Sequence, residues 1–379
     1  MHIVIAPNAF KNSLSATDAA KAIKEGLLLS KLDCSCTCFP VGDGGDGTGE
    51  LIIHHSNGTV VPATVYDPLG RKINSSFGLI DNGKTAVIEM ANASGLRLLK
   101  QEELNPLKTN SYGTGELITA ALNNGVNKII LCIGGTATVD GGTGILQALG
   151  LRFLNVDGNE LTTLPEQLDE VDKVDTTFLD KRIFNCEIII LCDVENTLLG
   201  NEGAARVFGP QKGADAAMTE KLETLLINWK NVLLRQTGKD ISMIKHGGAA
   251  GGVAATMQAL FNARLVNGIE EFLRLTHFDE ALNKADVVFT GEGSIDEQTL
   301  QGKGPFGVAK KAKEKNIPVI GLAGKIPSPV PASLQTYFDS LISINSEPVD
   351  ITTTLKNTYQ NLERTATMVG NNLHQSSIH

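Results

Sequence analysis

Apolar runs and amphipathic segments alternate at both ends of the chain, and the amphipathic segments have the period of a helix. A strand, a helix and a second strand in succession imply parallel strands joined by a right-handed crossover. We expect strands at 2–6, 36–41, 286–289, 318–322 and 341–344, and helices from the Ser15 cap to Leu29, at 48–55 and at 306–316.

The middle of the chain has a different pattern. Short apolar runs within 60–89 are separated by the turn signals 67–70 and 81–83, which is typical of antiparallel hairpins. Residues 151–183 are acidic and show no clear period, so we expect an irregular segment there. The predicted fold class is α/β, with two α/β domains: an open parallel-sheet domain made of residues 1–58 and 283–379, and an inserted domain, 59–282, with a mixed sheet.

Composition narrows the class of protein. The chain has 379 residues and a net charge of −9, and it lacks the basic patch that nucleic-acid-binding proteins carry. Its start has neither a basic segment nor a long apolar one, and no apolar run reaches the about 18 residues of a membrane span. The six cysteines form neither a disulfide framework nor a zinc pattern. We therefore expect a cytoplasmic protein without nucleic-acid or membrane partners.

Glycine mixed with Asp, Lys or Thr follows nearly every predicted strand. In an open parallel sheet, ligands bind beyond the carboxyl ends of the strands. These segments are therefore expected to share one crevice: 7–13, 42–48, 134–142, residue 193, 290–305 and 323–325.

The segment 290–305 carries more charge than a structural turn requires, and we interpret it as a functional loop between a strand and a helix. Glu292 and Asp296 supply carboxylates that could hold Mg²⁺, and Lys303 supplies an amine for phosphate. This combination favours phosphoryl transfer. The alternative is a long solvated loop.

The glycine-rich segment 134–142 precedes a predicted helix. Amides at a helix N-terminus, together with Thr136 and Thr138, could cradle phosphate, and the alternative is an ordinary glycine-rich helix entry. Gln211 and Lys212 lie in a predicted turn, where they could bind a carboxylate or a phosphate.

The segment 42–47 matches G-x-G-x-x-G between a strand and a helix, which is the context of a dinucleotide loop. Asp43 and Asp46 lie inside it and would repel a pyrophosphate. A nicotinamide-dependent oxidoreductase of a small hydroxy acid is therefore the alternative enzyme class, and a non-enzymatic small-molecule sensor is the third hypothesis. No Walker A or protein-kinase motif is present, so phosphoryl transfer would use another scaffold.

Seven motifs occur in order between residue 1 and about residue 370: NAFKNSLSA at 8–16, DGGDGT at 43–48, IEMANASG at 88–95, SYGTGELI at 111–118, GGTATVDGG at 134–142, FGPQKGA at 208–214 and GEGSIDEQ at 291–298. Together they resemble the motifs of type-1 glycerate kinases. The resemblance implies ATP-dependent phosphorylation of D-glycerate with Mg²⁺, and 2-phosphoglycerate is favoured over 3-phosphoglycerate as the product. It also implies that the discontinuous domain is flavodoxin-like and that the site lies in the cleft between the domains. The oligomeric state stays open, and a homodimer is compatible with the sequence.

Under this hypothesis Asp193 is the expected catalytic base, because an acid at the end of a buried apolar strand has no evident structural role. Asp43 is the reserve base, Lys11 is expected to neutralise phosphate oxygens, and Glu292 and Asp296 are expected to hold Mg²⁺. Substrate and phosphate contacts are expected from Ser13, Asp46, Thr114, Gly134, Gly135, Thr136, Thr138, Gln211, Lys212, Gly291, Gly293, Thr299 and Lys303. For Thr114, capping of the nearby helix is the alternative.

The chain departs from the family pattern at several positions. The family usually has Asp, Ser and Asn where this chain has Asn8, Ala9 and Val139, and it often has Arg where this chain has Ser294 and Tyr112. The loss of two arginines could alter the substrate or lower the affinity for it. Compensation by the lysine at position 325 is a further hypothesis.

Overall fold

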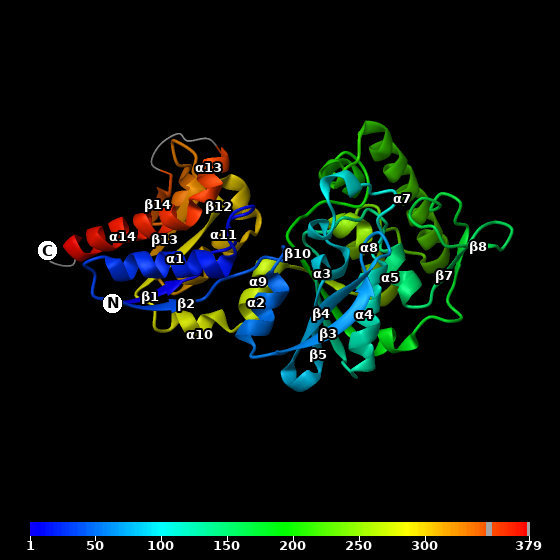
Figure 1. Cartoon of the computed structure of the whole chain (residues 1–379), viewed down its shortest axis with the longest axis horizontal. Coiled ribbons are helices and arrows are strands. Elements are labelled where there is room, and N and C mark those ends of the chain that lie inside the picture. Colours follow the sequence, from blue (N-terminus) through cyan, green and yellow to red (C-terminus); the bar gives the residue numbers. More distant parts are fainter. Residues whose placement is uncertain (346–350, 377–379) are drawn as a thin grey trace. The chain divides into compact units, whose positions relative to one another are not determined.

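The computed structural model describes residues 1–345 and 351–376. The chain divides into two compact units, each built from both helices and strands (Figure 1). The first unit comprises Met1–Asp43 and Gly268–His379, and the second comprises Gly44–Asn267.

The described strands of the first unit form one five-stranded parallel sheet in the order β14-β13-β12-β1-β2. Numbered along this unit, the order is 2-1-3-4-5, which is that of flavodoxin-like folds and confirms the predicted fold class. The strands are β1 (His2–Ile5), β2 (Ser35–Cys38), β12 (Val287–Ser294), β13 (Val319–Lys325) and β14 (Ser340–Ser343).

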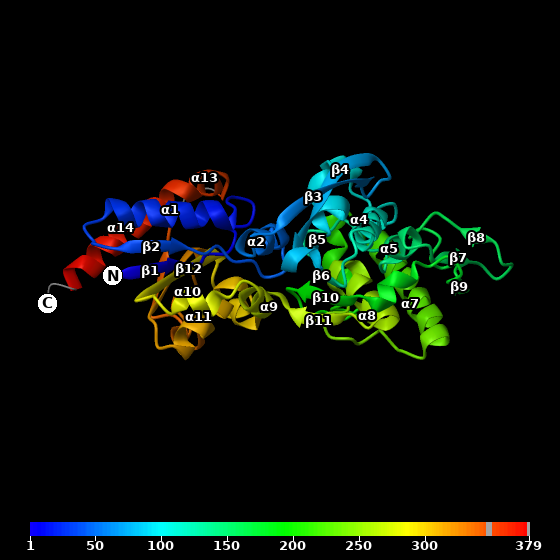
Figure 2. The same ribbon diagram turned by 90° about the horizontal axis from the view of Figure 1, so that it is seen from below.

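Helices cover both faces of this sheet: α1 and α14 pack side by side on one face, and α10 and α11 lie on the other (Figure 2). As the sequence predicted, the Ser15 hydroxyl caps α1 by accepting a hydrogen bond from the Asp18 amide (3.0 Å). The helices of the unit are α1 (Ala16–Leu29), α9 (Gly268–Leu275), α10 (Phe278–Leu282), α11 (Gly304–Glu314), α12 (Ala332–Gln335), α13 (Ile351–Lys356) and α14 (Thr358–Ser376), with a 3₁₀ turn at Glu297–Gln301.

The main sheet of the second unit has, among the described residues, six strands in the order β11-β10-β6-β5-β4-β3. The first four are parallel, and β4 and β3 continue the sheet as antiparallel hairpins, so the predicted mixed sheet is confirmed. The strands are β3 (Thr59–Tyr66), β4 (Lys72–Ile80), β5 (Thr85–Glu89), β6 (Lys128–Cys132), β10 (Glu187–Cys192) and β11 (Arg264–Asn267).

Helices α2 and α4 both pack on β5, which is buried along its whole length. The sole tryptophan, Trp229, lies in the core of this unit on α7, and its ring centroid is 5.5 Å from that of Phe153. The helices are α2 (Thr48–His55), α3 (Ala91–Ser94), α4 (Tyr112–Asn123), α5 (Thr143–Ala148), α6 (Ala204–Phe208), α7 (Ala216–Thr237) and α8 (Val253–Phe261), with 3₁₀ turns at Asp81–Gly83, Leu96–Leu98, Gln101–Glu103, Lys181–Asn185, Pro210–Lys212 and Ala249–Gly252.

The expectation that 151–183 is irregular is only partly right. This segment contains a small antiparallel sheet in the order β8-β7-β9, whose strands are β7 (Arg152–Leu154), β8 (Glu160–Leu161) and β9 (Lys173–Asp175). Strands of two or three residues are too short to show a period in the sequence. This sheet packs against α5 and α7.

The expectation that residues 290–305 form a loop is also partly wrong, because β12 continues to Ser294. Its last residues pair in parallel with β13, up to Ser294 opposite Lys325. Glycine and glutamate are poor strand formers, but the neighbouring strand supplies backbone partners that override this preference. Gly291 is required there, since a Cβ atom at this position would lie 2.2 Å from the carbonyl oxygen of Leu322.

The contact of α1 with α14 depends on Gly26. A Cβ atom at this position would lie 2.2 Å from the carbonyl oxygen of Glu363, so Gly26→Ala forces two backbones apart. We expect the free energy of unfolding to fall by about 1–3 kcal/mol, despite the better helix propensity of alanine. Urea unfolding followed by circular dichroism measures this. The control, Leu28→Ala on the exposed face of α1, should change it by less than about 0.5 kcal/mol, and equal effects of both substitutions would contradict the packing argument.

Candidate active site

In the first unit, β1 and β12 are neighbours although the rest of the chain separates them in sequence. The strand order reverses between them, which makes their carboxyl ends the expected ligand position of a flavodoxin-like sheet. The backbone continues this contact beyond β1, since the amide of Asn8 donates to the carbonyl of Gly291 (2.8 Å). The Asn8 side chain then donates to the carboxylate of Asp43 (2.8 Å).

Glu292, on β12, is the most deeply buried acid at these strand ends, with 8% of its surface exposed. Burial raises the pKa of its carboxyl to about 7, and the negative charge of Asp43 raises it further, whereas Lys303 acts in the opposite direction. Asp43 also accepts a weak hydrogen bond from the Gly304 amide at the start of α11 (3.3 Å). The charges of these two carboxyl groups therefore influence each other.

Asp296 and Thr299 hold the turn after β12. The Asp296 carboxylate caps the 3₁₀ turn by accepting from the Gln298 amide (2.9 Å). The Thr299 hydroxyl accepts from the Asp296 amide (3.1 Å) and donates to the Glu292 carboxyl (3.0 Å). The turn therefore fixes the position of the buried acid.

The other predicted residues of this unit differ in accessibility. Lys303 is half-buried at the N-cap of α11, and Lys11 is exposed. Gly293 is open, and its nearest contact is the Lys11 amide, 3.8 Å from an added Cβ atom. Ser13 is tied elsewhere, because its hydroxyl donates to the Leu355 carbonyl (2.5 Å).

In the second unit, two glycine segments meet where β6 ends. The Gly134 amide donates to the Gly44 carbonyl (3.0 Å), and a Cβ atom on Gly134 would lie 2.4 Å from the Cα atom of Gly45. Gly44 also lies beside the end of β10, where its Cβ atom would be 3.5 Å from the amide nitrogen of Asp193. Asp193 is exposed, so its carboxylate is accessible beside these loops.

Lys212 is buried against the segment 134–142, with only 2% of its surface exposed. Its ammonium donates to the Thr138 carbonyl (2.7 Å) and to the Thr136 hydroxyl (3.2 Å). Burial lowers the pKa of this amine to about 8, against the attraction of Asp140, which raises it. The Thr138 hydroxyl is buried and has no hydrogen-bond partner in the part of the chain that the structure describes, so this segment contains unused polar capacity.

The segment 134–142 is anchored from behind. The indole of Trp229 donates to the Thr256 hydroxyl (2.9 Å), which donates to the Gly141 carbonyl (2.6 Å). Two other predicted residues differ in exposure. Thr114 is fully buried, and its hydroxyl is hydrogen-bonded to that of Ser94 (2.7 Å). Gln211 is exposed.

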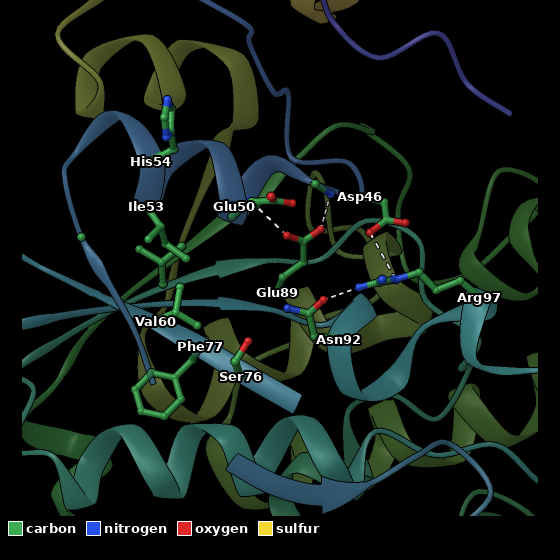
Figure 3. A pocket seen from close by; sticks show the side chains of 14 residues that line it. Asp46, Glu50, Ile53, His54, Val60, Ser76, Phe77, Glu89, Asn92 and Arg97 are labelled. Carbon is green, nitrogen blue, oxygen red and sulfur yellow. Dashed lines mark hydrogen bonds and ion pairs between the residues drawn. The ribbon is translucent and has the colours of Figure 1, made fainter. Parts of the chain in front are cut away.

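A cavity of about 580 Å³ opens beside Asp46 in the second unit (Figure 3). Glu89 lies in its wall and accepts hydrogen bonds from the amides of Gly47 and Gly49 (the latter 3.1 Å). The last amide of the G-x-G-x-x-G segment, that of Gly47, is therefore engaged by a carboxylate. Burial raises the pKa of Glu89 to about 7, and the hydrogen bond from Gly47 opposes this rise.

Comparison with known proteins places these motifs in a family. A model of the glycerate kinase family matches residues 3–374. The chain belongs to the glycerate kinase family. It is 42% identical to glycerate 2-kinase of Escherichia coli K12 over 96% of both chains, and 41% identical to glycerate kinase of Bacillus subtilis 168 over 97% of this chain and 96% of that one. A crystal structure from Salmonella typhimurium LT2, of a protein named as a candidate glycerate kinase 2, aligns over both whole chains with a TM-score of 0.84 and 41% identity.

Two positions that depart from the glycerate kinase pattern lie near the strand ends. Ser294 ends β12 opposite Lys325, which is exposed, and compensation by this lysine stays a prediction. Tyr112 begins α4, and its ring packs against that of Tyr66 with a centroid distance of 6.0 Å. Val139 differs from both, because it is fully buried in the apolar core and could not contact a ligand in this conformation.

Sequence reasoning missed four polar residues of this glycerate kinase fold: Glu89, Asn92, Arg97 and Asp140. Asp140 is fully buried and accepts hydrogen bonds from Ser111 and from the amide of Gly142 (3.0 Å), so it shapes the segment 134–142. Three of the four, Glu89, Asn92 and Asp140, lie inside the motifs at 88–95 and 134–142. An acid or amide among apolar residues was the sequence feature that could have identified them.

The raised pKa of Glu292 has a consequence for stability. In the unfolded chain this carboxyl ionises near 4.5, whereas the folded protein keeps its proton up to about 7. The folded state binds more protons in this window, so its stability falls as the pH rises from about 4.5 to 7. Glu292→Gln keeps an acceptor for Thr299 but never ionises.

We therefore expect Glu292→Gln to be more stable than the wild type at pH 8, by up to about 3 kcal/mol, and to lose this advantage below about pH 4.5. Urea unfolding in the presence of EDTA at the two pH values measures the difference. Glu297→Gln, on the exposed side of the same turn, is the matched control. A difference that is independent of pH would refute the assignment.

Proposed function

We propose that this chain transfers the γ-phosphoryl group of MgATP to the 2-hydroxyl of D-glycerate, giving 2-phosphoglycerate. Membership of the glycerate kinase family supports the reaction class, and the name of the Escherichia coli relative, glycerate 2-kinase, supports the choice of hydroxyl. The single observation that carries the proposal is the buried ammonium of Lys212 on the glycine-rich segment 134–142. Among residues 1–345 and 351–376, no carboxylate pairs with this ammonium, and a buried cation of this kind favours an anionic ligand.

Phosphoryl transfer requires positioning and neutralisation of charge more than covalent chemistry by the protein. In this proposal the amide of Gly135 and the hydroxyl of Thr136 contact phosphate oxygens, Gly134 lets the backbone approach closely, and Lys212 neutralises the phosphate charge. Lys11 and Lys303 are the cations proposed to bind phosphate oxygens in the first unit. The 3₁₀ turn that carries Gln211 holds Lys212 in place.

Asp193 is the proposed base, which orients the glycerate hydroxyl and takes its proton as the bond to phosphorus forms. Its exposed position after β10, beside the loop of Gly44, supports this role. Asp43, whose carboxylate accepts hydrogen bonds from Asn8 and Gly304, is the reserve candidate.

We further propose that Glu292 and Asp296 meet the Mg²⁺ that arrives with ATP. The donor set fits this ion, since carboxylate oxygens are its preferred ligands and Asp43 and Asp296 add negative charge near Glu292. Among the described residues, no group of three or more His, Cys, Asp or Glu side chains could hold a metal by itself. This is compatible with a magnesium ion bound mainly by phosphate oxygens and by one or two carboxylates.

The test of the base is Asp193→Asn. Because asparagine cannot accept the proton, we expect kcat with MgATP and D-glycerate to fall by about 10²–10⁴, while the Kd for MgATP changes little. A coupled assay for ADP, with the product identified by NMR, gives both the rate and the phosphorylated hydroxyl. Asp157→Asn, in an exposed turn of the same unit, is the control. If Asp193→Asn keeps a wild-type kcat, Asp193 is not the base.

The test of the phosphate contact is Lys212→Met, which keeps the length of the side chain and removes its charge. We expect the Kd for MgATP to rise on the order of tenfold or more, since a charge-assisted hydrogen bond to phosphate is lost. Isothermal titration calorimetry measures it, and circular dichroism verifies folding. Lys221→Met, on the solvent side of α7, should leave the Kd unchanged; an unchanged Kd for Lys212→Met would remove this residue from the site.

A further inference from the structure

The cavity beside Asp46 is assigned no role in the proposal above. It lies wholly within the second unit, between α2, the strands β3, β4 and β5, and the turn after α3 (Figure 3). Its volume of about 580 Å³ lies within the range of sites for drug-sized ligands and far exceeds the needs of a three-carbon acid.

One part of the cavity is apolar. Ile53 and Val60 supply its accessible hydrophobic surface, whereas Val87 and Phe77 are almost fully buried and the ring of Phe77 lies on the other side of β4 from Ser76 (Figure 3). Gly58 also lines it, at a point where a Cβ atom would lie 2.7 Å from the side chain of Ile80. Such a surface suits one face of a planar heterocycle, which gains by burial against aliphatic carbon.

The other part is polar and predominantly acidic. Asp46, Glu50 and Glu89 line it, and Arg97 is the one arginine or lysine among the lining residues. Arg97 pairs with Asp46 (3.7 Å) and donates to the side chain of Asn92 (Figure 3). Three carboxyl groups disfavour a carboxylate or a phosphate inside the cavity, whereas they favour hydroxyl and amino groups that donate hydrogen bonds.

The polar part adjoins the glycine-rich segment. A Cβ atom on Gly135 would lie 3.2 Å from the Cβ atom of Asp46, and the Leu96 amide, next to Arg97, donates to the Gly135 carbonyl (2.9 Å). A ligand seated in the cavity could thus extend past Arg97 toward Thr136 and the ammonium of Lys212.

We propose that this cavity is the nucleoside site of the enzyme. The base lies on the apolar surface of Ile53 and Val60, the ribose hydroxyls donate to Glu89 and Glu50, and the phosphates leave past Arg97 toward Gly135. The inference rests on the proposed function, since it assumes that a nucleotide is the phosphoryl donor.

The test fills the cavity from its rim. Val60→Trp adds an indole at a position whose side chain is 64% exposed, so the fold should tolerate it. Ser76→Leu, which fills the cavity from β4, is the second variant in case the first does not fold. The matched control is Thr64→Trp, which adds the same indole to an exposed position of β3 that does not line the cavity.

Calorimetry on the full chain then compares three probes: MgATP, adenosine and tripolyphosphate. We expect Val60→Trp and Ser76→Leu to raise the Kd for MgATP and for adenosine on the order of tenfold or more, and to leave the Kd for tripolyphosphate within about twofold. Thr64→Trp should change none of the three. The KM for ATP should rise by a factor similar to that of the Kd for MgATP, whereas the KM for D-glycerate should stay unchanged.

Three results would overturn the inference: unchanged nucleotide affinity in both folded variants, an equal loss for tripolyphosphate, or a rise confined to the KM for D-glycerate. A wild-type chain that binds neither MgATP nor adenosine would overturn it as well. A wild type that binds MgATP in the cavity but does not phosphorylate D-glycerate would refute the proposed acceptor alone, because binding is measured without turnover.

Discussion

The first unit depends on the parallel pairing of β1 with β12. These strands come from opposite ends of the chain, and their backbone ladder is reinforced by the His2 amide on the Asp286 carboxylate (2.6 Å) and by the Thr290 hydroxyl on the Ala6 carbonyl (2.8 Å). Without this contact there is no central sheet, and the order of strands could not reverse beside Glu292. Closing so long a loop is costly in entropy, but the cost grows only slowly with its length.

Both units hold ionisable groups in places where burial disfavours their charge. Glu292 and Glu89 have raised pKa values, and Lys212 has a lowered one. None of these groups is needed to fill a core, and an apolar side chain of similar size would avoid the desolvation. Such groups concentrate at functional sites, where their protonation and pairing change when a ligand arrives. The proposed function gives this destabilising arrangement a physical reason.

The period of apolar residues predicted the fold class, because alternating strands and helices leave a strong signal. It did not predict β7, β8 and β9, which are too short, or the extension of β12 through Gly291 and Gly293, which follows from pairing with β13. Among the candidate site residues, the rule that ligands bind at strand ends was enough to gather Asp43, Glu292 and Lys303. The rule could not predict side-chain partners, because these depend on contacts between segments that are distant in sequence. Examples are the hydrogen bond of Ser13 to Leu355, the burial of Thr114 and the hydrogen bond of Glu89 to Gly47.

The chain contains a single tryptophan, and its indole is joined by two consecutive hydrogen bonds to the carbonyl of Gly141. All intrinsic indole fluorescence therefore originates behind the segment that follows β6. A change in that backbone alters the hydrogen bond of the emitting group itself. The protein thus carries its own optical probe of the glycine-rich segment, at a site that needs neither label nor substitution.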